Sequence, residues 1–384
     1  MKIAKIESWP INIPYKHMEK SALVARSGVT DLIIKITTDS GLVGWGESTR
    51  VADVFGIQAA IKAMTPVVLG RSPWNREAIC RDIFDSGPWL YQEMTANLAY
   101  AGIDMALWDL CGKEVGKPLY QLFGGAMREE VNYFYYLTYT DLDSVRAQCE
   151  DGVKKGFSVF YVKVGINAEF EEQMLRTIRQ TIGPKAKLRI DTNQAWSPLT
   201  ARRLLNRWHE MFDLDFAEAP TRIEPLEIMH ELKRQTPVAL CANEGMWRAE
   251  EVHRIIASRA VDFLCFSPYW VGSISTFLRL CHLADFHGIQ VVKHTHGEYG
   301  IAAAVCQHLM LAIPNAAEGH QQTAYMMAGD VIKGDIPIST GPTWGMIESP
   351  GIGFEVDEKA VKKYHEAFLK DGPFIIYGDK FPVK

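Results

Sequence analysis

The region from residue 159 to residue 244 contains four short apolar runs, namely VFYVKV (159–164), LRID (188–191), FDLDFAE (212–218) and VALCANE (238–244). Each run has the length and the Val, Phe and Leu content of a buried strand, and amphipathic helical spacing fills the intervals between them. Similar runs occur at 131–137, 263–266, 289–292 and, more weakly, 316–318. Eight such strands, spaced by roughly 25 residues and mostly separated by helices, predict a parallel (β/α) barrel.

An open, doubly wound α/β sheet is the alternative arrangement for this rhythm. A sheet of that kind that binds dinucleotides carries a glycine-rich turn after a strand, and no such turn follows any of the eight runs. We therefore expect a closed barrel over residues 128–328.

The sequence outside these residues has a different pattern. Residues 1–127 begin with alternating β-branched segments at 2–13, 31–38 and 42–47, and a helical stripe follows at 96–115. The Asp39-Ser40-Gly41 turn predicts a hairpin between the second and third segments. This part is expected to form an α+β unit, and the tail at 329–384 is expected to run back over it.

The overall composition is that of an average globular protein. The 384 residues are 47% hydrophobic and 23% charged, with a net charge of −5 and scattered basic residues, which argues against nucleic acid or an anionic membrane as a partner. No apolar stretch is long enough to span a bilayer, and the N-terminus lacks a signal-peptide pattern. The seven cysteines include no CxxC pair and are typical of a reducing compartment, so we expect a cytoplasmic protein.

Three acids provide the strongest chemical signal. Asp191, Glu218 and Glu244 stand at or just after strand ends, and the separations of 27 and 26 residues correspond to one βα unit each. Such spacing brings the acids together at the C-terminal mouth of a barrel, where active sites lie. Grouped carboxylates repel one another unless a cation lies among them, and oxygen ligands favour Mg²⁺ first and Mn²⁺ second. Alternatively, each acid is a helix N-cap or an exposed loop residue.

Two further strand ends carry residues that suit proton transfer. Lys163 lies one βα unit before Asp191 and is a candidate base, with Tyr161 on the same strand face. His294 and His296 follow the run near 289–292, and histidine exchanges protons near neutral pH. The alternatives are an outward-pointing lysine and structural histidines.

Less specific signals suggest residues that contact the substrate. Glu318 and His320 follow the eighth run and are candidates for the same mouth. Lys16, His17 and Lys20 form a cationic group after the first segment, which is either a solvated loop or a mobile lid for an acidic substrate. If this group is a lid, substitutions that neutralise Lys16 and Lys20 are expected to raise the KM for an acidic substrate.

The chain resembles the enolase superfamily, in particular its mandelate racemase/muconate lactonizing enzyme-like members and, in character, its acid-sugar dehydratases. The resemblance covers nearly the whole length and rests on GLVGWGES (41–48), AGIDMALWDLCGKEVGKPLYQLFGG (101–125), RIDTNQAW (189–196), FAEAP (216–220), NEGMW (243–247) and KHTHGE (293–298). It implies a (β/α)7β-type, TIM-like barrel with an N-terminal capping domain completed by the C-terminal tail. It also implies Mg²⁺ on Asp191, Glu218 and Glu244, with His294 as the catalytic histidine.

Three departures from the family pattern limit how many residue roles can be transferred to this chain. The usual Lys-x-Lys appears as Tyr161-Val162-Lys163, and Ser267 stands where an aspartate normally partners the histidine. The glutamate of the eighth strand aligns with either Glu318 or His320. Glu244 also follows Pro237 by two residues more than is usual, which makes Asn243 a fallback ligand.

The resemblance implies abstraction of an α-proton from a Mg²⁺-bound hydroxy-carboxylate through an enediolate. Dehydration of an acid sugar is our main expectation; racemisation or epimerisation, cycloisomerisation and a catalytically lapsed binding protein are the alternatives. The expected partner is a small-molecule carboxylate, and the expected assembly is a homo-oligomer from dimer to octamer. The predicted catalytic residues are Lys163, His294 and Tyr161, and the predicted substrate-binding residues are Lys16, His17, Lys20, Asn193, His296, Glu318 and His320.

Overall fold

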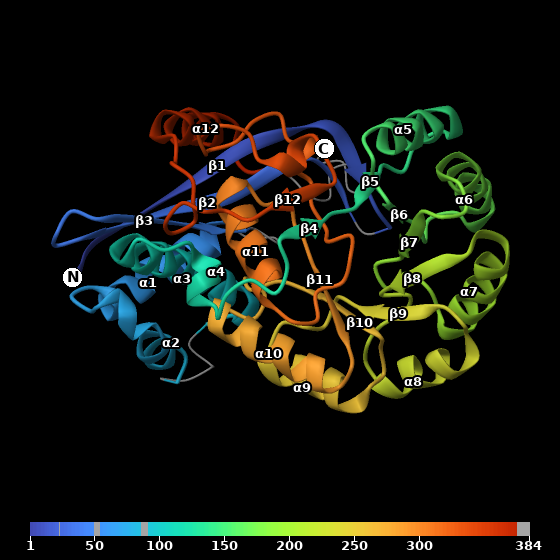
Figure 1. Ribbon diagram of the computed structural model, residues 1–384, viewed down its shortest axis with the longest axis horizontal. Helices are drawn as coiled ribbons and strands as arrows, with labels where there is room; N and C mark the ends of the chain where they lie inside the picture. The colour runs from blue at the N-terminus through green and yellow to red at the C-terminus, as the bar shows by residue number, and fades with distance from the viewer. Residues whose placement is uncertain (23, 50–53, 86–90, 375–384) are drawn as a thin grey trace.

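The computed structural model describes residues 1–22, 24–49, 54–85 and 91–374. Its N-terminal part contains a three-stranded antiparallel sheet in the order β1 (Ile3–Lys20), β2 (Ala25–Thr38) and β3 (Val43–Ser48), which Figure 1 shows in blue. The hairpin predicted at residues 39–41 joins β2 to β3, and Gly41 there adopts the positive φ of 82° that favours glycine. The strand β1 extends seven residues beyond the predicted segment 2–13.

Helices pack against one face of this sheet and complete the capping unit. They are α1 (Val54–Val68), η1 (Pro73–Asn75), α2 (Arg76–Phe84), α3 (Glu93–Val115) and α4 (Leu119–Leu122). The longest, α3, lies so close to β3 that a Cβ at Gly46 would meet the Gly102 carbonyl oxygen at 1.9 Å. The glycines of the GLVGWGES stretch therefore permit the contact between strand and helix.

The second part is a curled, parallel, seven-stranded sheet with helices on its outside, as Figure 1 shows. The strands are β5 (Tyr135–Leu137), β6 (Val159–Lys163), β7 (Lys187–Asp191), β8 (Leu214–Glu218), β9 (Ala239–Ala242), β10 (Phe263–Phe266) and β11 (Gln290–Lys293). The helices are α5 (Leu142–Lys154), α6 (Ala168–Ile182), α7 (Pro198–Phe212), α8 (Leu226–Gln235), α9 (Ala249–Ser258), α10 (Ile274–Phe286) and α11 (Gly300–Ala312). The predicted alternation of strands and helices is confirmed.

The segment 315–321 lies between β11 and the chain around β5. It forms single parallel bridges to both neighbours, Val291 with Ala316 and Tyr133 with His320. The Gln321 amide donates to the Lys293 carbonyl at 2.9 Å, and the Phe134 amide donates to the His320 carbonyl at 3.1 Å. The weak eighth run therefore occupies the gap between the first and last strands, although it is too irregular to form a continuous strand.

The interior of the sheet contains an apolar layer below the mouth. Phe216, Cys241, Cys265 and Val292 are almost fully buried there and form a small core separate from the main hydrophobic core. These side chains belong to β8, β9, β10 and β11 and all point inward. They exclude water beneath the ends of the strands, where the predicted site residues stand.

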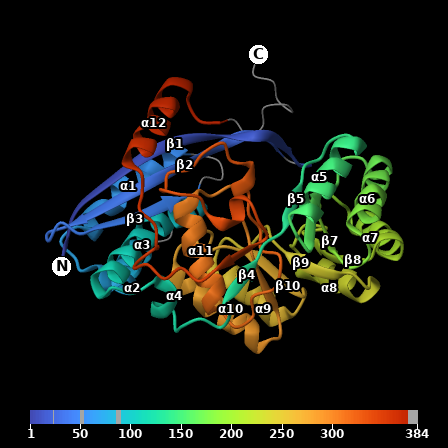
Figure 2. The ribbon, with the colours of Figure 1, turned by 45° about the horizontal axis from the view of Figure 1, so that its top comes forward.

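The C-terminal tail returns to the capping unit. After η3 (Ala324–Met326) and η4 (Pro337–Ser339), β12 (Thr343–Gly345) pairs with β4 (Glu130–Asn132), and α12 (Glu358–Asp371) packs on β1, as Figure 2 shows. The Asn12 amide donates to the Gly372 carbonyl at 2.7 Å. No helix within the described part of the chain has the length and apolar character needed to cross a membrane.

Two buried carboxylates join the capping unit to barrel helices. Glu47, at the end of β3, accepts from the amides of Tyr299 and Ala302 at 2.7 and 2.9 Å, at the start of α11. Asp104, in α3, accepts from the Ile274 amide at 2.8 Å, at the start of α10. Both acceptors lie at helix N-termini, where backbone N–H groups lack partners within the helix.

Asp104 gives the stability a pH dependence that can be measured. Burial raises the pKa of this carboxyl to about 7, although the Ile274 hydrogen bond and the charge of Arg76 oppose the shift. The protonated Asp104 carboxyl therefore contributes to the free energy of unfolding. This contribution is fully present below the unfolded pKa of about 3.9 and is lost as the pH rises through about 7. Asp104→Asn should therefore gain stability relative to the native chain between pH 4 and pH 8, as judged by urea midpoints. Glu355→Gln, at an exposed ion pair with Lys333, is the control, and a pH-independent difference for Asp104→Asn would contradict the assignment.

Candidate active site

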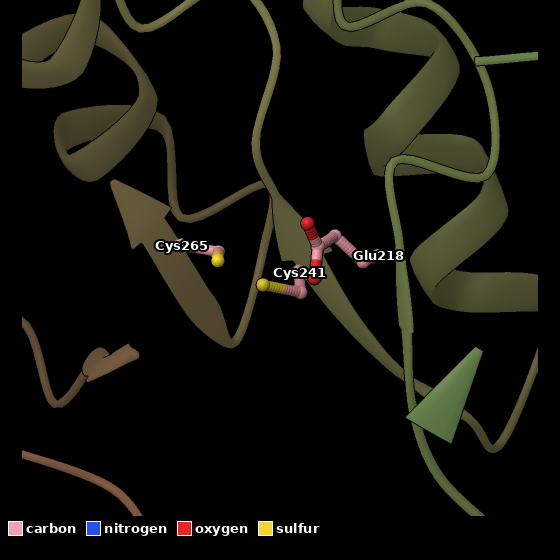
Figure 3. Close-up of side chains that lie close together, drawn as sticks. All are labelled: Glu218, Cys241 and Cys265. Carbon is pink, nitrogen blue, oxygen red and sulfur yellow. The ribbon is translucent and has the colours of Figure 1, made fainter. Parts of the chain in front are cut away.

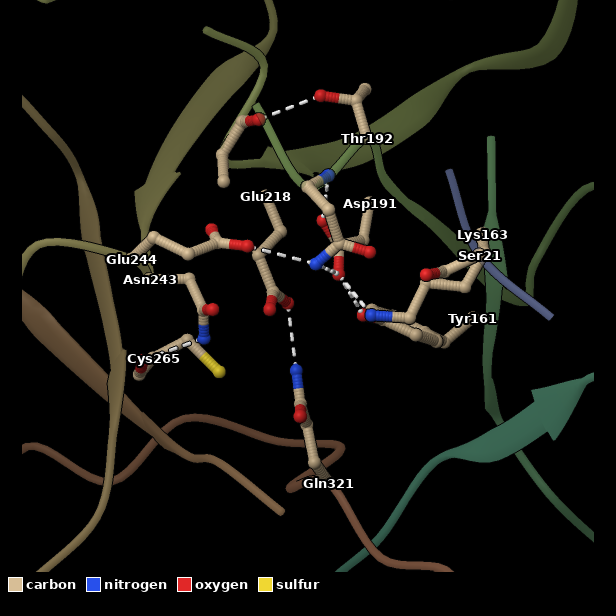
Figure 4. A network of polar contacts seen from close by, with 12 residues as sticks. Ser21, Tyr161, Lys163, Asp191, Thr192, Glu218, Asn243, Glu244, Cys265 and Gln321 are labelled. Carbon is tan, nitrogen blue, oxygen red and sulfur yellow. Dashed lines mark hydrogen bonds and ion pairs between the residues drawn. The ribbon is translucent and has the colours of Figure 1, made fainter. Parts of the chain in front are cut away.

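The three predicted acids lie at the C-terminal mouth of the barrel. Asp191 and Glu218 end β7 and β8 opposite one another in register, and both are almost fully buried. Glu244 follows β9, and the Asn193 amide group donates to Asp191 Oδ2 at 3.2 Å and to Glu244 Oε1 at 2.9 Å. Figure 4 shows the three carboxylates directed toward one another from neighbouring strands. Acids that are one βα unit apart in the sequence therefore lie side by side at the mouth of the barrel.

Burial makes this concentration of negative charge costly. Burial, followed by the charge of Asp191, raises the pKa of Glu218 well above its usual range and that of Glu244 to about 7. The Oε2 atom of Glu244 is buried and has no hydrogen-bond partner among the described residues. Three carboxylates with an unsatisfied oxygen are the donor set that a hard divalent cation needs, and a cation there would favour the ionised forms.

Lys163 and Tyr161 approach the acids from β6. The Tyr161 hydroxyl donates to Asp191 Oδ2 at 2.6 Å, and the Lys163 ammonium forms an ion pair with the same oxygen. Burial lowers the pKa of Lys163, but the charges of Asp191 and Glu218 outweigh it, so the net pKa is raised. A cation shared by these acids would offset much of their charge, which leaves desolvation to favour a neutral amine.

The two histidines follow β11 and lie under Trp270. The Trp270 ring lies 4.3 Å from the His294 ring between centroids, and its indole N–H donates to His296 Nδ1 at 3.3 Å. Burial lowers the pKa of His294 well below its usual value, and the nearby His296 and Lys163 add to the shift. His294 Nδ1 and the Ser267 hydroxyl are both buried without a hydrogen-bond partner within the described ranges. Among the residues that the structure describes, no carboxylate therefore accepts a hydrogen bond from His294 Nδ1.

This combination of fold and strand-end residues matches known proteins. Residues 144–360 match the family model described as enolase C-terminal domain-like, and residues 5–124 match the N-terminal domain of mandelate racemase and muconate lactonizing enzyme. The chain belongs to the enolase superfamily.

Individual superfamily members align along most of the chain. The N-succinyl-L-Arg/Lys racemase of Bacillus cereus is 26% identical over 94% of this chain and 98% of its own length. The arabinonate dehydratase of Saccharolobus solfataricus is 26% identical over 86% of this chain and 89% of its own length. Among solved structures, a substrate-liganded L-Ala-D/L-Glu epimerase of Bacillus subtilis has a TM-score of 0.85 at 26% identity, covering 92% of this chain and 99% of that one.

The eighth segment of this superfamily member supplies a residue that sequence reasoning missed. The Gln321 amide donates to Glu218 Oε2 at 2.7 Å, and its oxygen accepts from the Thr295 amide at 3.2 Å. Figure 4 shows Gln321 directed at the acids from below. No local pattern signals this residue, because the segment forms only single bridges and its residues do not alternate regularly between two faces.

The predictions for Glu318 and His320 at the mouth are wrong. Glu318 is exposed and lies 3.5 Å from Lys187, the first residue of β7, at the opposite end of the barrel from Asp191. His320 is buried on the outer side of the sheet, where its Nδ1 accepts from the Lys293 amide at 3.0 Å and its ring packs against Tyr133. The segment enters from the bottom of the barrel, so only its last residues reach the mouth.

Asn243 is turned away from the acids. Its side-chain amide donates to the Cys265 carbonyl at 3.0 Å on the neighbouring strand, whereas Glu244 shares Asn193 with Asp191. The arrangement therefore favours Glu244 over the fallback ligand.

The cationic group near the N-terminus lies beside the site, not on a loop. Lys16, His17 and Lys20 belong to the strand β1, so the prediction of a loop is wrong. The pairing of β1 with β2 is irregular between Pro14 and Glu19 and resumes at Glu19 and Lys20. They line a cavity of about 1030 Å³ between β1, β5 and α5. Tyr136 also lines it and lies 5.6 Å from Tyr161 between ring centroids, so one aromatic layer separates the cavity from Lys163.

Gln321 provides a test of how the acids are held. Because its amide orients one oxygen of Glu218, we expect Gln321→Ala to weaken Mg²⁺ binding by roughly 10- to 100-fold, the range for residues that orient metal ligands. Isothermal titration calorimetry with Mg²⁺ measures the change. Gln290→Ala, at an exposed position at the other end of β11, is the matched control, and equal Mg²⁺ affinity in both variants would remove Gln321 from the site.

Proposed function

We propose that this enolase superfamily member is a Mg²⁺-dependent racemase or epimerase of a carboxylate that carries a hydrogen on its α-carbon. The observation that supports this proposal most directly is the placement of Lys163 and His294. Lys163 ends β6 and His294 follows β11, and these strands stand on either side of the strands that carry the acids, β7, β8 and β9. Both side chains are largely buried, and the positive charge of Lys163 contributes to the lowered pKa of His294. Inversion needs one proton-transfer group on each face of the α-carbon.

Asp191, Glu218 and Glu244 would hold the cation, with Mg²⁺ first and Mn²⁺ second. Superfamily sites pair a lysine or histidine base with Mg²⁺, which stabilises the charge that develops on the substrate carboxylate. Lys163 would release Asp191 and take the α-proton on one face, and His294 would deliver a proton to the resulting enediolate on the other. Tyr161 holds Asp191 Oδ2 in place during this exchange of partners.

The lowered pKa of His294 fits this role in one respect. A buried imidazole without a carboxylate partner stays neutral at pH 7, so it accepts the α-proton directly when the reaction runs in the reverse direction. To deliver a proton to the enediolate in the forward direction, His294 must first take one up from solvent and become the imidazolium. The Ser267 hydroxyl, which stands on the neighbouring strand end, is the polar group available to orient the ring in place of the usual aspartate.

The substrate class follows from the relatives. The racemase and the epimerase act, by their names, on N-succinylated Arg or Lys and on an Ala-Glu dipeptide. N-acylated amino acids and dipeptides are therefore the first compounds to test. Dehydration of an acid sugar, our main expectation from the sequence, is the second candidate, and the alignment with an arabinonate dehydratase favours it.

Solvent exchange tests the proposal. Incubation with Mg²⁺ and a panel of N-succinyl amino acids, dipeptides and acid sugars in D₂O should place deuterium on the α-carbon and give both configurations. Lys163→Ala should reduce exchange of the isomer it deprotonates by roughly a thousandfold or more, because general-base catalysis and positioning are both lost. Tyr161→Phe should slow the reaction but leave exchange detectable.

The products separate the outcomes. Inverted, deuterated substrate supports racemisation or epimerisation, whereas a keto acid formed with loss of water supports dehydration instead. If Tyr161→Phe abolishes exchange while Lys163→Ala retains it, the tyrosine is the base. Absence of exchange with every compound in the panel, in protein that binds Mg²⁺, would favour a lapsed binding protein.

A further inference from the structure

Two cysteines lie directly beneath the acid cluster. Cys241 on β9 is the register partner of Glu218 on β8, and Cys265 stands on the next strand, β10. One carboxylate oxygen of Glu218 and the two sulfur atoms all lie within 4.8 Å of one another, and all three residues are almost fully buried. Figure 3 shows the two thiols and the carboxylate directed into the same space.

We propose that Glu218, Cys241 and Cys265 form a second metal site, selective for a thiophilic divalent cation such as Zn²⁺ or Cd²⁺. Two thiolates and one carboxylate are a soft, low-coordinate donor set, which suits these ions and not Mg²⁺. At a tetrahedral zinc centre with Zn–S bonds of about 2.3 Å, ligand atoms are separated by roughly 3.8 Å. The three ligand atoms thus need to approach one another by about 1 Å at most, which side-chain rotations can provide.

Binding of the cation to the two sulfur atoms releases the protons of both thiols. Each cysteine gives up its thiol proton when its sulfur binds the cation, so two protons leave for each ion bound. The Cys241 thiol donates to the Ala242 carbonyl at 3.6 Å and also has a hydrogen bond with the Cys265 thiol, and binding of the cation replaces these weak thiol contacts. The other members of the layer, Phe216 and Val292, are apolar and exclude competing water.

The site shares Glu218 with the proposed Mg²⁺ site, and this sharing makes the two ions antagonists. A carboxylate turned down toward the sulfur atoms is no longer available to the acids above it, and Gln321 would lose its partner. A soft cation would therefore inactivate the enzyme from beneath the mouth without touching the substrate. The proposal concerns metal binding alone and does not depend on which reaction the enzyme catalyses.

Titration of the purified, metal-free full chain with Cd²⁺ tests the site, because Cd–thiolate bonds give an ultraviolet charge-transfer band. We expect this band in the native chain and in the controls Cys281→Ala, which removes another buried cysteine, and Cys80→Ala, which removes a half-buried one. Cys241→Ala and Cys265→Ala should each lose the band or weaken Cd²⁺ affinity by about a hundredfold or more, above the loss typical of residues that only orient a ligand. Circular dichroism establishes that each variant is folded, and the two single variants serve as replicates if one is not.

Competition with Mg²⁺ completes the experiment. At a Mg²⁺ concentration of about ten times its own Kd, mutual exclusion raises the apparent Kd for Cd²⁺ about elevenfold. A band that persists unchanged in both Cys241→Ala and Cys265→Ala would overturn the proposal, because other cysteines would then bind the ion. Cd²⁺ binding without a charge-transfer band would also overturn it, since the ion would then occupy the oxygen ligands alone. A band that is insensitive to Mg²⁺ would remove Glu218 from the site.

Discussion

The repulsion between buried carboxylates at the barrel mouth is the constraint around which the site is built. Asp191 and Glu218 are almost completely shielded from water, so neither can disperse its charge into solvent. Four hydrogen-bond donors from three segments surround these acids, namely Tyr161 and Lys163 from β6, Asn193 from the loop after β7 and Gln321 from the eighth segment. Each is a hydrogen-bond donor whose removal leaves a buried charge less satisfied.

The same donors connect the fold to its chemistry. Strand register sets the lateral order of the side chains, so Lys163, Asp191 and Glu218 meet because β6, β7 and β8 are consecutive neighbours. The apolar layer beneath them keeps the local dielectric low, which strengthens every interaction among the charges. A ligand that offsets the negative charge therefore changes the partners of Lys163 as well. The charge at the mouth and the contacts of Lys163 are thus coupled through one oxygen atom of Asp191.

Sequence periodicity was enough to place the acids, the lysine and the histidines at the ends of strands. In regular parallel strands, residues at equivalent positions of successive βα units lie at the same end of the barrel. It failed where the chain is irregular. The eighth segment makes single bridges and passes Gly319 with a φ of 64°, so its residues cannot be assigned to a face by counting from its apolar run. Gln321 was missed and Glu318 and His320 were misplaced for this reason. The length of β1 was also underestimated, since its polar end pairs with β2 at Glu19 and Lys20, beyond an irregularity that no local pattern reveals.

The links between the capping unit and the rest of the molecule bear on how the chain folds during synthesis. Glu47 accepts hydrogen bonds from Tyr299 and Ala302, and Asn12 donates one to Gly372, so the strands of the capping unit are completed by residues 252 to 360 positions later in the sequence. Contacts over such sequence separations carry a high entropic cost and form late. While the barrel emerges from the ribosome, the β1–β2 ribbon is left with an uncovered apolar face and unsatisfied acids. The N-terminal unit therefore completes its native contacts only once the chain as far as Gly372 is available to it.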